Sequence, residues 1–245
     1  MNRVESMAYS LILQMETSSD RCSVSLSQDE ECIAFIESTE ERNHAAMLMS
    51  LIDFVLRQAH IGVSHLAAVA VGAGPGSYTG LRIGMSTAKG LCYGAGIPLI
   101  AIPTLRAMAN GLLRQEPLIA SDALICPMID ARRMEVYTAL FDSKRNTVKE
   151  TCAEIINEHS FDEWIENQPI YFIGSGADKC KSLFQHPHAI FPLSYGYSAR
   201  DMISDAWKAY QNGHFESVAY SEPCYLKDFI AGKPRKSVFR TGLSE

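Results

Sequence analysis

The sequence has no apolar run approaching the roughly 20 residues that a membrane-spanning helix needs. Its first ten residues also lack the long apolar stretch of a secretory signal peptide. Positive charge is in short supply, because 22 Lys and Arg residues stand against 28 Asp and Glu residues, a formal net charge of −6. A broad non-specific nucleic-acid surface needs an excess of positive charge. We therefore expect a cytoplasmic protein with no membrane anchor and no large nucleic-acid surface of its own.

Paired cysteines are absent as well. The seven cysteines are scattered along the chain, and no two of them form a CxxC pair. An odd and scattered set does not fit a disulfide framework or a zinc site, so we expect reduced thiols packed as small buried hydrophobes. What the sequence does contain is apolar residues, which make up 47% of its 245 positions. That is enough for a packed core in one large domain or two small ones.

The first half of the chain has the pattern of a three-stranded meander followed by alternating helices and strands. Short apolar or alternating runs between polar turns predict strands, and apolar residues at helical spacing predict helices. In chain order the predicted elements are strands at 11–15, 22–26 and 32–36, a helix at 43–59, a strand at 66–71, a helix at 81–93, a strand at 99–102 and a helix at 104–113.

After Pro117 the pattern begins again, with strands predicted at 124–129, 135–141 and 147–155, a helix at 159–166, a strand at 170–173 and a further helix. In both halves a strand ends in an acid and leads into a hairpin, with Glu16 and Asp130 at equivalent places. This repetition indicates two duplicated lobes. We expect an N-terminal lobe at 1–116, a C-terminal lobe at 117–220 and a basic tail at 221–245 that contains Lys233, Arg235, Lys236 and Arg240.

The strongest local motif is the glycine-rich segment 72–84, which follows an apolar strand and opens a helix. Glycines permit close backbone approach, and a helix N-terminus offers unpaired N–H groups to an anion. No GK[ST] follows, so the segment is not a P-loop. Glycine-rich turns also serve tight packing, and the loop alone favours neither phosphate contact nor packing.

Two helices carry candidate contact surfaces. The helix at 43–59 has an apolar stripe that includes Leu48, Leu51, Ile52 and Val55. Periodicity favours a stripe that faces the chain's own core, and a stripe that faces a partner chain is the alternative. The helix at 81–93 is rich in small residues, which are tolerated where a neighbouring helix, a ligand or a second subunit must come close.

Three segments in this order, 13–18, 72–84 and 130–137, together with 222–227, resemble the TsaB (YeaZ) family of bacterial tRNA threonylcarbamoyladenosine biosynthesis proteins. The resemblance implies an α/β fold with two related lobes of actin-like ATPase-domain (ribonuclease H-like) type, in which mixed sheets are flanked by helices. It also implies a non-catalytic subunit that pairs with the related transferase TsaD, works with the ATPase TsaE on adenosine 37 of tRNA, and forms a homodimer in isolation. Contact with tRNA would then be indirect, through the complex.

The resemblance implies a set of partner-interface residues on the two helices, namely Leu48, Leu51, Ile52, Val55, Leu81, Met85, Ala88 and Cys92. The catalytic relative carries an HxxxH pair that helps to hold a metal ion, whereas the matching positions here are Thr104 and Met108. Neither side chain can replace a histidine ligand. We therefore expect no metal site and no catalytic residue in this chain.

Nucleotide binding is left open by the resemblance, because ATP or ADP could lie at the lobe cleft or at the partner interface. Glu16 and Asp130 lie where an actin-like kinase places acids near metal and phosphate, although each could instead hold its own turn. The candidate phosphate or nucleotide contacts are Glu16, Gly74, Gly76, Ser77, Asp130, Gly174 and Gly176. The alternative function is an actin-like phosphotransferase or ATPase, or a metal-dependent hydrolase.

Overall fold

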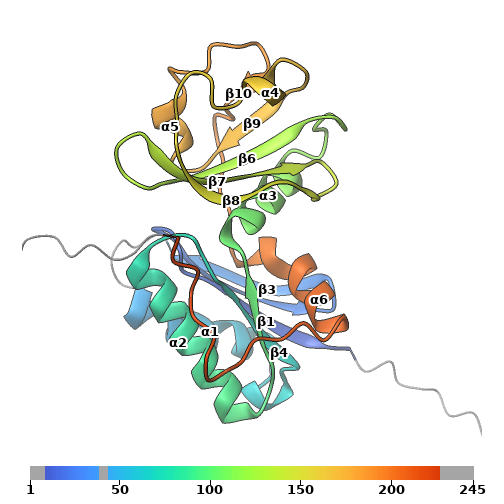
Figure 1. Cartoon of the computed structure of the whole chain (residues 1–245). Coiled ribbons are helices and arrows are strands. Elements are labelled where there is room, and N and C mark those ends of the chain that lie inside the picture. Colours follow the sequence, from blue (N-terminus) through green and yellow to red (C-terminus); the bar gives the residue numbers. More distant parts are fainter. Residues whose placement is uncertain (1–8, 39–43, 227–245) are drawn as a thin grey trace, which may run out of the picture.

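The computed structural model describes residues 9–38 and 44–226, and Figure 1 shows them as two lobes with α3 (Thr104–Gln115) between them. The first lobe is built on a five-stranded sheet of order β3-β2-β1-β4-β5. β1 pairs antiparallel with β2 and parallel with β4, β2 pairs antiparallel with β3, and β4 pairs parallel with β5. These strands are β1 (Leu11–Glu16), β2 (Cys22–Gln28), β3 (Glu31–Ser38), β4 (Ala68–Gly72) and β5 (Leu99–Ile102).

The second lobe repeats this plan with the order β10-β9-β6-β7-β8. Its first three strands form an antiparallel meander, and β9 and β10 extend the sheet in parallel. They are β6 (Leu124–Asp130), β7 (Glu135–Asp142), β8 (Thr147–Ile155), β9 (Ile170–Ile173) and β10 (Ala189–Ile190). The expectation of a mixed α/β protein with two related lobes is confirmed. β1 and β6 hold equivalent central places, so Glu16 and Asp130 end equivalent strands.

Side chains alternate across each strand, so each sheet has two apolar faces to cover. One face of the first sheet packs under α1 (His44–Gln58) and α2 (Tyr78–Ala95). The short helix η1 (Val63–His65) lies between these two helices in the sequence. The other face packs under η2 (Ala199–Met202) and α6 (Ile203–Gln211). Alternate residues of one strand divide accordingly, because Ile12 belongs to the second of these cores and Leu13 to the first.

The second sheet is covered by an aromatic cluster on one face and by α3 (Thr104–Gln115) on the other. In the cluster, Phe161 meets Phe172 and Phe184 edge-on. The short helices α4 (Asp162–Ile165) and α5 (Ala177–Cys180) complete this lobe. α3 also packs against η2, so one helix joins the second sheet to the elements that close the first.

Several elements differ from the sequence predictions. The helix predicted at 159–166 contains only the single turn α4. Residues 199–211, which the sequence grouped with the second lobe, pack against β1 and β5 of the first. The chain then returns along α2, where Lys89 Nζ donates to the carbonyls of Ala219 and Ser221 at 3.1 and 3.0 Å (Figure 1). We call residues 214–226 the return segment.

Three further expectations concern the basic tail, the cysteine thiols and membrane-spanning helices. The basic cluster of the tail lies outside the described residues. Four of the seven cysteines are buried, whereas Cys32 and Cys224 are exposed. No helix in the described ranges is both long and apolar enough to span a membrane.

Candidate functional site

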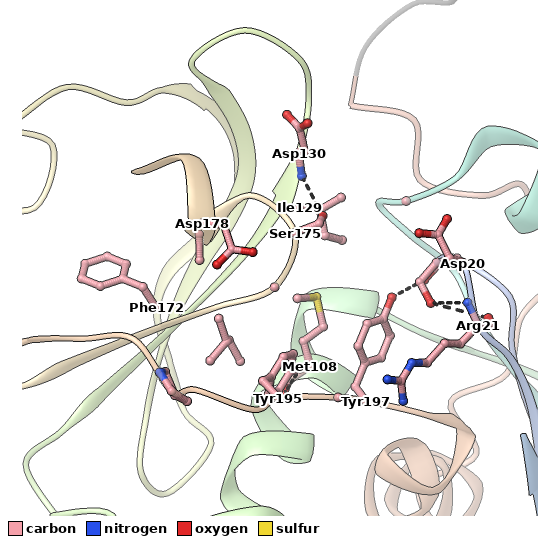
Figure 2. A pocket seen from close by; sticks show the side chains of 18 of the residues that line it. Asp20, Arg21, Met108, Ile129, Asp130, Phe172, Ser175, Asp178, Tyr195 and Tyr197 are labelled. Carbon is pink, nitrogen blue, oxygen red and sulfur yellow. Dashed lines mark hydrogen bonds between the residues drawn. The ribbon is translucent and has the colours of Figure 1, made fainter. Parts of the chain in front are cut away.

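A cleft of about 570 Å³ lies between the two lobes. Figure 2 shows Asp20 and Arg21 on its first-lobe side, Asp130, Ser175 and Asp178 on its second-lobe side, and two tyrosines between them. The walls come from the turn after β1, the glycine-rich loop, the end of β6, the turn after β9 and the segment before η2. All of these are strand ends or connections, which is where open α/β sheets bind ligands.

The glycine-rich loop is held against the turn that follows β1. Gly76 has no room for a side chain, since a Cβ there would lie 2.6 Å from the Ser18 carbonyl oxygen. A Cβ on Gly80 would clash with the carbonyl oxygen of Thr17. Ser77 is the N-cap of α2, and its Oγ accepts a hydrogen bond from the Gly80 N–H at 3.2 Å. These contacts explain the glycines by packing, with no phosphate required.

Glu16 is buried behind the cleft wall and does not line it. Its Oε1 accepts a 2.6 Å hydrogen bond from the Ser18 N–H, whereas its Oε2 is buried with no partner among the described residues. Burial raises the pKa of the Glu16 carboxyl, outweighing the hydrogen bonds from Ser18 and Thr17 that lower it. Glu16 therefore holds its own turn.

Asp130 plays the same local part in the second lobe, although it is exposed. Its Oδ1 accepts from the Arg132 N–H at 2.9 Å, the same two-residue spacing as between Glu16 and Ser18. Lys179 Nζ also bonds to this oxygen and to the Glu135 carbonyl. The Lys179 hydrogen bond is the main reason why the pKa of the Asp130 carboxyl is lowered.

Two tyrosines that the sequence did not single out fill the middle of the cleft (Figure 2). The Tyr195 hydroxyl donates to the Met108 carbonyl at 2.7 Å, and the Tyr197 hydroxyl shares a 2.9 Å hydrogen bond with Ser18 Oγ. Burial raises the pKa of both hydroxyls. No local motif marks these residues, because they lie in an irregular segment that only the tertiary fold brings to the cleft.

Four of the seven predicted phosphate or nucleotide contacts line the cleft, namely Gly76, Ser77, Asp130 and Gly174. The other three do not. Glu16 is buried behind the wall, Gly74 packs against Cys224 and Leu81, and Gly176 donates its N–H to the Met128 carbonyl at 2.9 Å. The structure therefore brings together part of the predicted set, and it adds Asp20, Arg21, Tyr195 and Tyr197.

The charge of the cleft is a poor match for a nucleoside triphosphate. Three carboxylates, Asp20, Asp130 and Asp178, line it against the single guanidinium of Arg21. The nearby Lys179 is bonded to Asp130. A polyphosphate alone would meet net negative charge here. The N-terminus of α2, capped by Ser77, also reaches the cleft and offers N–H groups to an anion.

Thr104 and Met108, which stand where the catalytic relative has its metal-binding histidines, both lie on α3. Thr104 is buried at the start of α3, and its Oγ1 accepts from the Gly74 N–H at 3.1 Å. Met108, one turn later, lines the cleft. Within residues 9–38 and 44–226, no three His, Cys, Asp or Glu side chains are grouped so that they could hold a metal ion.

The residues predicted to form the partner interface are buried in the first lobe's own core. The exposed fraction of every one is 5% or less, and seven of them pack together against the sheet. The prediction of these side chains as a partner surface is therefore wrong, because an apolar stripe at helical spacing faces the sheet it covers. They are Leu48, Leu51, Ile52, Val55, Leu81, Met85, Ala88 and Cys92.

The comparison with curated proteins decides the family. Over 236 residues the chain is 30% identical to the tRNA threonylcarbamoyladenosine biosynthesis protein TsaB of Escherichia coli, covering 91% of this chain and 96% of that protein. The chain belongs to the TsaB family. The TsaB of Bacillus subtilis is 29% identical over 180 residues, 71% of this chain and 75% of that protein.

A solved structure and a family model agree with this membership. YeaZ from Pseudomonas aeruginosa matches with a TM-score of 0.78 and 25% identity, over 89% of this chain and all of that one. The model of the TsaD family, described as tRNA N6-adenosine threonylcarbamoyltransferase, matches residues 35–228. This TsaB-family chain is therefore similar to the transferase as well as to TsaB proteins.

Proposed function

We propose that this TsaB-family chain is a non-catalytic cytoplasmic subunit required for N6-threonylcarbamoyladenosine formation at adenosine 37 of tRNA. In this proposal it scaffolds a TsaD-type transferase and works with TsaE. The observation that carries the proposal is the double similarity, to TsaB proteins over nearly the whole chain and to the TsaD family over residues 35–228. A chain built like the transferase and lacking its metal-binding pair is suited to pairing with it.

Two features in and behind the cleft walls support a non-catalytic role. Thr104 is used to fasten the glycine-rich loop, and Met108 has only a thioether to offer a ligand. The carboxylates of Glu16 and Asp130 are both used to hold their own turns. The alternative function, an ATPase or phosphotransferase, would need positive charge for the phosphates where the cleft presents three acids.

The outward faces of α1 and α2 are the surface best suited to the transferase. On α1, Met49 and Phe54 are about half exposed, at 52% and 48%. On α2, Tyr93 is 85% exposed, and a Cβ on Gly90 or Gly94 would meet no atom of the described part of the chain within 4 Å. Bare glycines beside an exposed aromatic ring allow another helix to approach closely. The two helices pack against each other, so these residues share one side of the lobe.

Reconstitution tests the function. Threonylcarbamoyl transfer to tRNA would be measured with TsaD and TsaE, with and without this chain, and with this chain alone. We expect transfer to require this chain and never to come from it alone. Transfer by this chain alone, or ATP turnover by the purified chain, would overturn the proposal.

The surface is tested by Phe54→Asp, which places a charge on the outer face of α1. We expect co-purification with TsaD to fall by at least about tenfold, since a charge buried in an apolar interface costs well over 1.4 kcal/mol. The matched control is Leu118→Asp, which makes the same kind of change at a residue 95% exposed outside both helices. Equal binding of TsaD by both variants would exclude the outward faces of α1 and α2 as the contact with TsaD. The same faces are expected to form the homodimer.

A further inference from the structure

A second, smaller hollow of about 260 Å³ lies beside the cleft and shares Arg21 and the wall of residues 195–197 with it. Three arginines from separate elements line this hollow. Arg21 comes from the turn after β1, Arg114 from the last turn of α3 and Arg200 from η2. Such convergence stands out in a chain with a net charge of −6. We call these three residues the arginine cluster.

Two members of the cluster are held in place by carboxylates. Arg114 Nε donates to Asp201 Oδ1 at 2.7 Å, and the Asp201 side chain is fully buried and also accepts from the Ser198 N–H. Arg21 donates through one terminal nitrogen to Glu37 Oε1 at 3.1 Å. A guanidinium has five N–H groups, so each of these arginines has donors beyond those bonds. Both side chains are close to half exposed, which leaves those donors within reach of a ligand.

Arg200 has no carboxylate partner in the described part of the chain. Its guanidinium lies over the Phe35 ring, with Cζ 3.9 Å from the ring centroid. Its Nε is buried and makes no hydrogen bond to any described residue. A buried donor without an acceptor is costly, and native proteins rarely leave one unsatisfied. Because Nε is too deep for a ligand to reach, an anion in the hollow would bind through the terminal nitrogens of Arg200, whose side chain lines it.

The charges and the geometry identify the anion. Three guanidinium groups face two carboxylates, Glu37 and Asp201, so the cluster has one positive charge in excess. Planar forks from three elements match an anion with three or four oxygens better than a carboxylate with two. We propose that the arginine cluster binds a phosphate group, either of a small molecule or of an RNA backbone. This site is separate from the acidic cleft and does not depend on the proposed function.

The test is a titration of the full chain with inorganic phosphate and with pyrophosphate at constant ionic strength, so that screening does not change. We expect saturable binding with a Kd in the millimolar range or below, and we expect Arg200→Gln to weaken it by about tenfold or more. The matched control, Arg57→Gln, removes the same charge from exposed α1 and should leave binding within about twofold. Binding that is equal in all three proteins, or absent up to about 20 mM, overturns the proposal.

A second arm distinguishes the sources of the phosphate. A short single-stranded oligoribonucleotide without terminal phosphates is titrated into the same proteins. Tighter binding that depends on Arg200 assigns the site to RNA, and binding of free phosphate alone assigns it to a small molecule. Arg21→Gln tests the cluster independently if Arg200→Gln unfolds, which a thermal melt reveals. Undiminished phosphate binding by a folded Arg21→Gln variant would also overturn the proposal.

Discussion

Glu16 shows how the surroundings of a single carboxyl group can shift its pKa. It ends the central strand of the first lobe, where burial raises its pKa and one of its oxygens has no partner among the described residues. A raised pKa means that the folded chain holds this proton more tightly than the unfolded chain does. The stability that the protonated Glu16 carboxyl contributes is fully present below its pKa in the unfolded chain, near 4.5, and is lost as the pH rises through its pKa in the folded chain.

We therefore expect Glu16→Gln to remove one source of pH dependence from the free energy of unfolding. As the pH rises above about 4.5, wild type should lose stability relative to Glu16→Gln, because only wild type must ionise a buried acid. Urea denaturation at a series of pH values measures this difference. The control is Glu166→Gln, which makes the same substitution at an exposed position. If Glu16→Gln ran parallel to wild type, Glu16 would not be the titrating group.

At the scale of elements, α2 is a helix with two different sides. Its inner side carries Gly80 and Gly84, where an added Cβ would clash with Thr17. Its outer side carries Gly90 and Gly94, where an added Cβ would meet no atom of the described residues within 4 Å. The inner glycines are explained by the fold of the free chain. The outer ones lower the stability of an isolated helix by about 1 kcal/mol each and gain nothing within the chain. This contrast supports a partner on the outer side.

Two glycine substitutions separate the sides of α2. We expect Gly80→Ala to destabilise the chain by about 2 kcal/mol or more, because its Cβ would clash with the Thr17 carbonyl oxygen.

We expect Gly90→Ala to stabilise the free chain by about 1 kcal/mol and at the same time to weaken co-purification with TsaD. Chemical denaturation and pull-down measure the two effects. Unchanged pull-down with Gly90→Ala would exclude close packing of the partner at this glycine.

The elements also show what the sequence can predict. The bounds of β5, β8 and β9 agree with those predicted, because short β-rich runs between turns are local signals. The stripe through Leu48 and Val55 was correctly favoured as a core stripe by its spacing alone. The resemblance assigned the same residues to a partner surface, and this failed because likeness to a family does not tell which side of a helix faces outward.

The site was less predictable than the strands. Gly76, Ser77 and Asp130 could be found because glycine turns and strand-end acids leave marks in the sequence. Tyr195 and Tyr197 leave none, since their segment has no regular spacing and meets Ser18 across 179 residues of chain. Arg21, Arg114 and Arg200 are likewise ordinary surface residues until the fold brings them together.

At the scale of the whole molecule, the chain begins and ends its described course in the first lobe. η2 and α6 cover the face of the first sheet that includes Ile12, Ala70 and Ile100. Cutting the chain into consecutive halves therefore does not separate the lobes. Long-range packing of this kind cannot be inferred from local periodicity.

Met202 tests this arrangement, because it is fully buried between η2 and the first sheet. We expect Met202→Ala to cost about 2–5 kcal/mol and to reduce amide exchange protection in β1, β4 and β5 more than in the second sheet. Met134→Ala, at a 36% exposed residue of the second lobe, is the control and should change little. Loss of protection confined to the second sheet would contradict the return of the chain to the first lobe.

The late position of α6 also sets an order of events during synthesis on the ribosome. All five strands of the first sheet are complete at Ile102, yet one apolar face of that sheet stays uncovered until residues 199–211 emerge. The second sheet is complete before then. A nascent chain that stalls between these points would display a hydrophobic sheet to its neighbours, so this interval is when the protein most needs a chaperone.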